Sequence, residues 1–164
     1  MGMSETVFAG IVAELRERAA RAEGLTELQE FLVREIPERL PYYNWTGFYM
    51  LDPADDQMLV LGPYNGAATE HVRIPVTEGI CGAAVAEDAT VIVDDVRADP
   101  RYLACSIETK SEIVVPIRAG GRVVGEIDID SHDAAAFGDG DRVFLEECAG
   151  VLGGFLERGQ GASK

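Results

Sequence analysis

The spacing of the apolar residues changes twice along this chain, and the change limits the folds that it can adopt. Over residues 4–40 apolar side chains recur every three or four positions, as on one face of a helix. Over residues 44–131 they alternate in short runs separated by turn residues, as in strands. The helical spacing returns over residues 139–158. This order predicts an α+β fold with an antiparallel sheet.

Local signals predict where the terminal helices begin and end. Gly24 is expected to end the first helix, and Thr26 with Gln29 matches a capping box for the second. Pro41 is expected to stop the second helix. The closing helix is expected to begin near residue 139 or 141. Its predicted apolar face comprises Val143, Phe144, Cys148, Val151, Leu152 and Phe155.

Six short strands and one inserted helix are expected between the terminal helices. The strands are predicted over residues 45–51, 57–64, 71–76, 90–93, 112–118 and 122–130, and the inserted helix over residues 79–87. Residues 94–111 form a long polar stretch without periodicity, and such a loop in a compact domain is usually functional. We therefore expect terminal helices on one face of the sheet and a ligand pocket covered by loops on the other.

Length and charge limit the partners of the chain. Its 164 residues fit one domain. The formal net charge of −15 repels phosphate backbones and anionic membrane surfaces at long range, which argues against nucleic acid and membrane partners. No apolar run is long enough to span a bilayer, and the N-terminus lacks a signal-peptide pattern. These features predict a cytoplasmic protein.

The cysteine and histidine pattern does not predict a metal centre or a disulfide framework. The chain has three cysteines, an odd number, and no secretory signal. Its two histidines, His71 and His132, are far apart, and no Cys-x-x-Cys or His-x-x-x-His spacing occurs. We expect no metal and no cofactor.

Two cysteines are candidates for redox chemistry. Cys81 lies between Gly79 and Gly82 where the inserted helix begins, and the helix dipole there favours a thiolate. The alternative is a small buried residue in a tight turn. Cys105 lies in the long loop, where reactivity explains a cysteine better than core packing does. If the loop folds over the helix, the two thiols can form a reversible disulfide. Cys148 is expected in the core.

Three acidic residues and two aromatic residues occur within predicted strands. Asp128 and Asp130 are two positions apart and share one face of the sheet, and Glu112 belongs to the preceding strand. Neighbouring carboxylates repel one another unless a cation or a shared proton is present, so they form either a solvated outer face or a site for an ammonium group. Trp45 and Tyr49 share a face and form either a pocket wall for a thioether or core packing.

Six short motifs together resemble a known family. They are Asn44-Trp45-Thr46-Gly47-Phe48-Tyr49, Leu61-Gly62-Pro63-Tyr64-Asn65-Gly66, Gly79-Ile80-Cys81-Gly82, Ala104-Cys105, Lys110-Ser111-Glu112-Ile113-Val114-Val115-Pro116 and Gly125-Glu126-Ile127-Asp128-Ile129-Asp130-Ser131. In this order they resemble the single-domain GAF proteins of the free methionine-(R)-sulfoxide reductase family, over about residues 45–155. The resemblance implies one GAF domain over residues 1–164, with a six-stranded sheet.

The resemblance implies reduction of free L-methionine-(R)-sulfoxide to methionine, with thioredoxin as the source of electrons. Cys81 and Cys105 match the redox cysteines of the family. One of them attacks the sulfoxide sulfur and becomes a sulfenic acid, with which another thiol condenses. We favour Cys105 as the attacking residue.

The resemblance also assigns the substrate contacts. Glu112, Asp128 and Asp130 match carboxylates expected to hold the substrate ammonium and the sulfoxide oxygen. Trp45 and Tyr49 match the aromatic wall around the methyl group.

Two departures from the family pattern keep other functions open. The family usually has a further cysteine ten positions before Cys81, where this chain has His71, and the residue after Cys105, commonly Asp, is Ser106. A non-catalytic GAF sensor that binds an amino acid or a small anion is therefore an alternative. A homodimer through the terminal helices, with Val7, Ile11 and Leu15 against a second copy, is compatible with either function.

Overall fold

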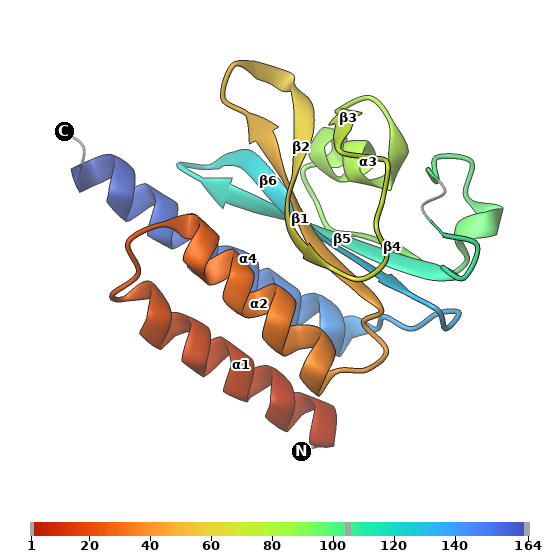
Figure 1. Cartoon of the computed structure of the whole chain (residues 1–164), viewed down its shortest axis with the longest axis horizontal. Coiled ribbons are helices and arrows are strands. Elements are labelled where there is room, and N and C mark those ends of the chain that lie inside the picture. Colours follow the sequence, from red (N-terminus) through yellow and green to blue (C-terminus); the bar gives the residue numbers. More distant parts are fainter. Residues whose placement is uncertain (1, 104–105, 163–164) are drawn as a thin grey trace.

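The structure is a computed structural model that describes residues 2–103 and 106–162 (Figure 1). The helices and strands follow the predicted order. They are α1 (Met3–Ala19), α2 (Leu25–Arg39), β1 (Trp45–Asp52), β2 (Asp55–Asn65), β3 (Arg73–Pro75), α3 (Gly79–Glu87), β4 (Val91–Val93), the 3-10 helix η1 (Val96–Ala98), β5 (Ser111–Ala119), β6 (Arg122–Ser131) and α4 (Asp139–Ala162). Within these described ranges, no helix is long and apolar enough to cross a bilayer.

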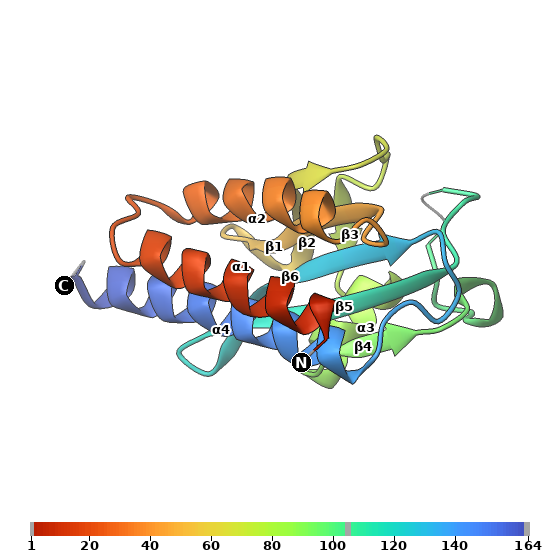
Figure 2. The same ribbon diagram turned by 90° about the horizontal axis from the view of Figure 1, so that it is seen from below.

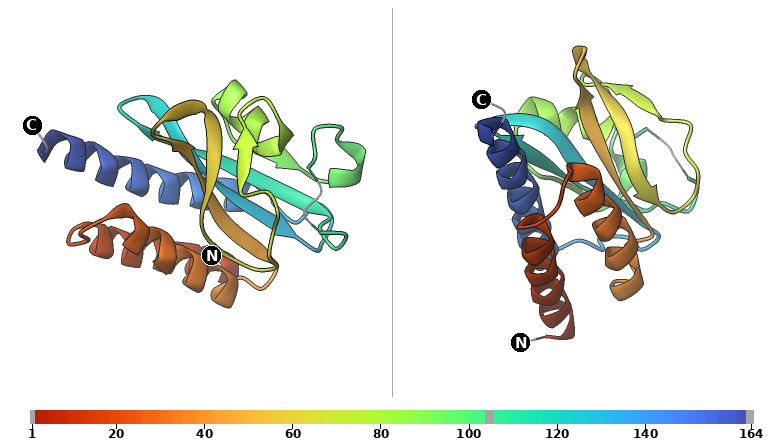
Figure 3. Two further views of the ribbon diagram at one scale, coloured as in Figure 1. Left: turned by 45° about the horizontal axis from the view of Figure 1, so that its top comes forward. Right: turned by 60° about the vertical axis from the view of Figure 1, so that its left-hand side comes forward.

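The strands form one antiparallel sheet in the order β3-β2-β1-β6-β5-β4. Figures 2 and 3 show α1, α2 and α4 on one face of this sheet and α3 with the strand connections on the other. The predicted α+β fold, with a six-stranded sheet and terminal helices on one face, is therefore confirmed.

The alternation of side chains along the strands divides the interior into two clusters. Ile113 of β5 and Ile127 and Ile129 of β6 pack beneath the terminal helices. Val114 of β5 and Tyr49 of β1 point to the opposite face and pack with α3. Because successive residues of a strand alternate between faces, the acidic residues that alternate with Ile127 and Ile129 also lie on the α3 side.

The ends of the N-terminal helices differ from the sequence prediction. Helix α1 ends at Ala19, and Gly24 precedes α2 as its N-cap, so the prediction that Gly24 ends the first helix was wrong. No side chain caps α2, so the predicted capping box of Thr26 and Gln29 does not form. The helix begins at Leu25, so Thr26 lies inside its first turn rather than at the N-cap, and Gln29 is buried.

Helix α2 contains Pro37 in its last turn and still continues to Arg39. Proline has no N–H, so the carbonyl of Val33 loses its partner within the helix. The amide Nδ2 of Asn65 donates a hydrogen bond to that carbonyl at 3.0 Å. A side chain of β2 thus replaces the missing backbone donor and attaches the helix to the sheet.

The predicted apolar face of α4 packs against the core except at Val143, with Val151 and Phe155 partly buried. Phe144, Cys148 and Leu152 are buried, as expected. Val143 is 47% exposed, because it lies beside the apolar stripe that faces the core. Strand β3 is shorter than predicted and begins at Arg73.

Candidate functional site

The acidic residues of β5 and β6 lie side by side on the face of the sheet beneath α3. Glu112 pairs with Asp130, and Asp128 pairs with Val114, in the antiparallel register of these strands. Glu112, Asp128 and Asp130 are at most 5% exposed. They are therefore buried, and the alternative of a solvated outer face was wrong.

A fourth carboxyl group, which the sequence analysis did not single out, lies on the same face. Glu126 is two residues before Asp128 in β6 and is fully buried. The two-residue period that placed Asp128 and Asp130 together extends to this position. Periodicity alone could have identified Glu126.

Helix α3 brings a thiol to these carboxyl groups. Its N-cap is Glu78 in extended backbone, and Cys81 follows in the first turn with 4% of its surface exposed. The Sγ atom of Cys81 donates a hydrogen bond to Oδ2 of Asp128 at 3.4 Å. A Cβ atom on Gly82 would lie 2.7 Å from the carbonyl oxygen of Val76, so only glycine allows the helix to start this close to the preceding turn.

The environment of Cys81 does not favour a thiolate. Burial, followed by the negative charges of Asp128, Glu126 and Glu112, raises the pKa of the Cys81 thiol well above its ordinary value. The prediction that the helix dipole favours its thiolate was therefore wrong. At neutral pH Cys81 is a protonated thiol that acts as a hydrogen-bond donor.

Three of the carboxyl groups hold protons more tightly than ordinary acids. Burial raises the pKa of Glu126 and of Asp130 well above the usual value, and the nearby charge of Asp128 raises both further. Burial also raises the pKa of Asp128, with the hydrogen bonds from Glu112 and Cys81 acting in the opposite direction.

Several oxygen atoms of this cluster lack a hydrogen-bond partner among the described residues. They are Oδ1 of Asp128, Oδ1 of Asp130 and both carboxyl oxygens of Glu126. No ion pair joins these three residues to a cationic side chain in the described ranges. Buried polar atoms are nearly always satisfied in native proteins, so unpartnered ones indicate a binding site for a donor or a cation.

The two aromatic residues differ in their relation to the site. Tyr49 is buried and lines the cavity, and its hydroxyl donates to the carbonyl oxygen of His71 at 2.7 Å. The Trp45 ring stacks on Tyr49 with centroids 6.3 Å apart and on Tyr64 at 5.4 Å. Trp45 does not itself line the cavity, so it supports the Tyr49 ring from behind.

The cavity beneath α3 is small. It is lined by Tyr49, His71, Ile74, Gly79, Ile80, Cys81, Leu103, Glu112 and Asp128. Its volume of about 20 Å³ has room for a water molecule but not for an amino acid. A hollow of about 400 Å³ lies next to it, and Gly79 and Leu103 line both. Leu103 therefore separates the buried cavity from the larger hollow.

The structure brings Tyr49, Cys81, Glu112 and Asp128 together around the cavity. Asp130 and Trp45 lie beside it without lining it. Cys105 falls outside the described residues, so its predicted proximity to Cys81 stays a prediction. His71, which stands where the related family has a further cysteine, also lines the cavity.

Comparisons with known proteins agree on one family. A GAF domain model matches residues 22–157. Protein YtsP of Bacillus subtilis is 43% identical over 113 residues, which are 69% of this chain and 68% of that protein. The free methionine-R-sulfoxide reductase of Escherichia coli is 40% identical over 115 residues, 70% of this chain and 67% of that enzyme.

A solved structure extends the similarity to nearly the whole chain. It is the free methionine-R-sulfoxide reductase from Neisseria meningitidis in complex with its substrate, which superposes with a TM-score of 0.90 at 31% identity. The match covers 99% of this chain and 95% of that one.

Proposed function

The chain belongs to the GAF-domain family, and we propose that within it the chain reduces free L-methionine-(R)-sulfoxide to methionine. Two relatives that carry this activity in their names match the chain at 42% and 40% identity, and a solved structure of the same name, at 31% identity, superposes over 99% of the chain. The carboxyl cluster beneath α3 is the observation that carries the proposal.

The carboxyl cluster suits a free amino acid. Unpartnered oxygens of Asp128 and Asp130 face the interior without a cationic side chain among the described residues. The ammonium group of a free amino acid carries a positive charge and three donors, which satisfy such oxygens. The backbone nitrogen of a residue within a polypeptide chain is an uncharged amide with at most one donor, so it satisfies these oxygens less well. Selectivity for the free amino acid follows from this difference in charge.

The redox steps assign different roles to the two cysteines. The Cys105 sulfur attacks the sulfoxide sulfur, and the sulfoxide oxygen is transferred to it, which yields methionine and a Cys105 sulfenic acid. The Cys81 thiol then condenses with the sulfenic acid, which gives a disulfide and water. A thioredoxin dithiol reduces the disulfide.

The raised pKa of Cys81 supports its assignment as the second thiol. A protonated, buried thiol is a poor first nucleophile. It is also protected from oxidants that reach the surface. A carboxyl group with a raised pKa, such as that of Asp130 or Asp128, can donate the proton that the leaving sulfoxide oxygen requires.

Turnover with a defined epimer tests the proposed function. The reduced chain is incubated with thioredoxin, thioredoxin reductase and NADPH, and NADPH oxidation is followed with the R epimer, the S epimer and an N-acetylated R epimer. Turnover is expected with the free R epimer alone. Cys105→Ser should abolish turnover, whereas Cys148→Ser, which alters a buried cysteine in α4, should retain it.

A sensor function predicts a different result in the same experiment. Saturable binding of the R epimer without product formation or thiol oxidation would favour a binding module over the reductase. His71, which lines the cavity where the related family has a further cysteine, would explain such a result.

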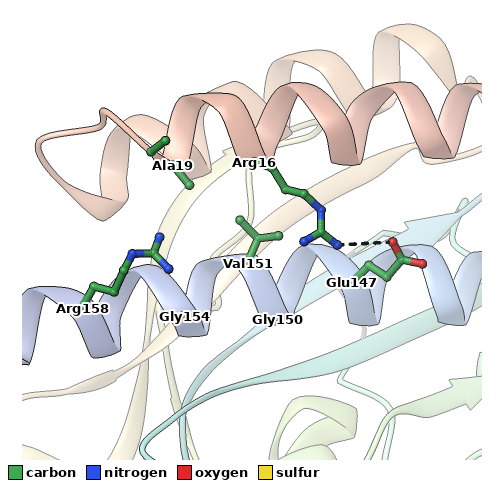
Figure 4. Close-up of a pocket in the computed structure, with 8 residues that line it drawn as sticks. Arg16, Ala19, Glu147, Gly150, Val151, Gly154 and Arg158 are labelled. Atoms are coloured by element: carbon green, nitrogen blue, oxygen red, sulfur yellow. Dashed lines mark ion pairs between the residues drawn. The ribbon is translucent and has the colours of Figure 1, made fainter.

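We also propose a cytoplasmic location and a homodimer through the terminal helices. Of the predicted dimer contact through Val7, Ile11 and Leu15, the part through Ile11 and Leu15 was wrong, because both are fully buried in the core of their own chain. Val7 is partly buried against that core. A groove of about 700 Å³ between α1 and α4 instead presents a surface to a partner (Figure 4). Arg16 and Glu147 form an exposed ion pair across it, at 3.8 Å. A monomer mass from light scattering at working concentration would refute the proposed homodimer.

A further inference from the structure

We infer that Cys81, Glu112 and Asp128 form a binding site for a thiophilic divalent cation of the zinc class. Their sulfur and carboxylate oxygen ligand atoms all lie within 4.8 Å of one another. The residues come from α3, β5 and β6, so no spacing in the sequence indicates the site. This is why the sequence analysis predicted no metal.

The ligand atoms lie within 4.8 Å of one another and would draw together around an ion. Zinc lies about 2.3 Å from a thiolate and about 2.1 Å from a carboxylate oxygen, so tetrahedral ligand atoms are roughly 3.4–3.6 Å apart. The Sγ atom of Cys81 is 3.4 Å from Oδ2 of Asp128. That pair already has the separation of two ligands of one ion.

A second observation points to a ligand at the same place. Oδ1 of Asp128 is buried without a hydrogen-bond partner among the described residues, although Asp128 lines the cavity. The cavity of about 20 Å³ is too small for an amino acid. A single ion fits there without any movement of Leu103.

The donor set selects the class of cation. A thiolate with two carboxylates suits zinc or cadmium, whereas magnesium and calcium prefer oxygen donors alone. Binding replaces the thiol proton, as in Cys81–SH + Zn²⁺ → Cys81–S–Zn⁺ + H⁺, and no electrons are transferred. The three protein ligands leave the fourth position open, as in open zinc sites.

The bound cation would inhibit the reductase, a consequence that rests on the proposed function. The ion occupies the carboxylates expected to hold the substrate ammonium, and it binds the sulfur that must condense with the sulfenic acid. Inhibition should therefore be relieved by substrate and by a chelator.

Cadmium titration of the reduced full-length chain tests the site without reference to activity. A thiolate-to-cadmium absorption band in the ultraviolet should grow until one equivalent has bound, and zinc but not magnesium should displace it. The band should be lost in Cys81→Ser and retained in both Cys148→Ser and Cys105→Ser. A band that persists in Cys81→Ser, or disappears in Cys105→Ser, would overturn the assignment.

A carboxylate variant keeps the test valid if Cys81→Ser does not fold. Asp128→Asn retains the thiol and should weaken cadmium binding by about tenfold or more. Glu30→Gln, at an exposed position of α2, is the matched control and should bind as the wild type does. Unchanged affinity in Asp128→Asn would contradict the site. Turnover without metal binding removes only this inference, and metal binding without turnover removes only the proposed function.

Discussion

The buried carboxyl group of Glu126 makes a quantitative prediction about stability and pH. Glu126 is fully buried, and neither of its carboxyl oxygens has a hydrogen-bond partner among the described residues. Burial raises the pKa of Glu126 well above its ordinary value, with a further increase from the charge of Asp128. The folded chain therefore keeps a proton that the unfolded chain releases near pH 4.3.

This proton difference sets the sign and the size of the effect. Above the pKa of the unfolded glutamate, the folded state binds more protons, so the free energy of unfolding decreases as the pH rises. The decrease is about 1.4 kcal/mol per pH unit for each such carboxyl, until the pH reaches its folded pKa. Glu126→Gln removes one titrating group and should make the decrease in the free energy of unfolding with pH less steep, by up to that amount.

Urea unfolding at several pH values between 5.5 and 7.5 measures the slope. This range lies below the ordinary pKa of cysteine, so Cys81 does not contribute. Glu30→Gln, at an exposed position of α2, should leave the slope as in the wild type. Equal slopes for Glu126→Gln and the wild type would refute the claim that Glu126 is protonated in the folded chain.

Four further substitutions test the packing of the chain, three of them around the cavity and one in α4. Gly82→Ala should destabilise the chain by about 1–3 kcal/mol in urea unfolding, because its Cβ would lie 2.7 Å from the Val76 carbonyl oxygen. Gly150→Ala, in α4 with nothing within 4 Å, should instead stabilise it by about 0.5–1 kcal/mol. Tyr49→Phe should lower the free energy of unfolding by about 1 kcal/mol, because the carbonyl oxygen of His71 loses its 2.7 Å hydrogen bond from the Tyr49 hydroxyl. An unchanged unfolding midpoint would contradict this. Leu103→Ala should join the cavity to the adjacent hollow and raise kcat/KM for the free sulfoxide, and an unchanged kcat/KM would show that Leu103 does not limit entry.

The architecture follows from hydrophobic periodicity because that signal is repeated along every element. The two-residue period of β6 placed Asp128 and Asp130 on one face, and the structure has both buried there. The same period includes Glu126, but the sequence does not reveal how far along the strand α3 extends its cover. Burial of the whole acidic row is a property of the packed layers rather than of the strand.

The charge state of Cys81 illustrates a limit of local reasoning. Its position at the start of α3 was predicted correctly, and a helix dipole contributes about 0.3–1 kcal/mol. Burial can shift a pKa by roughly 3–5 units, several times larger in free energy. The burial and the opposing carboxylates come from β5 and β6, at least 31 residues later in the chain. The residues near Cys81 in the sequence therefore do not reveal its burial or its carboxylate neighbours.

The predictions of the helix ends were wrong for a similar reason. Thr26 and Gln29 have the spacing of a capping box, yet the helix begins one residue earlier, at Leu25, and Gln29 is buried, so a cap worth about 1 kcal/mol does not decide where the helix starts. The continuation of α2 past Pro37 depends on Asn65, a residue of β2 that supplies a donor from outside the helix. Each exception involves a partner distant in sequence.

The pairing of Cys81 with Cys105 is tested most directly by mass spectrometry of the intact and digested chain after reaction with one equivalent of free methionine-(R)-sulfoxide. The account predicts a loss of two hydrogens and a peptide cross-linked between Cys81 and Cys105, with Cys148 still reduced. A sulfenic acid that persists on Cys105 beside an unmodified Cys81 thiol, or a chain without any oxidised cysteine, would contradict it.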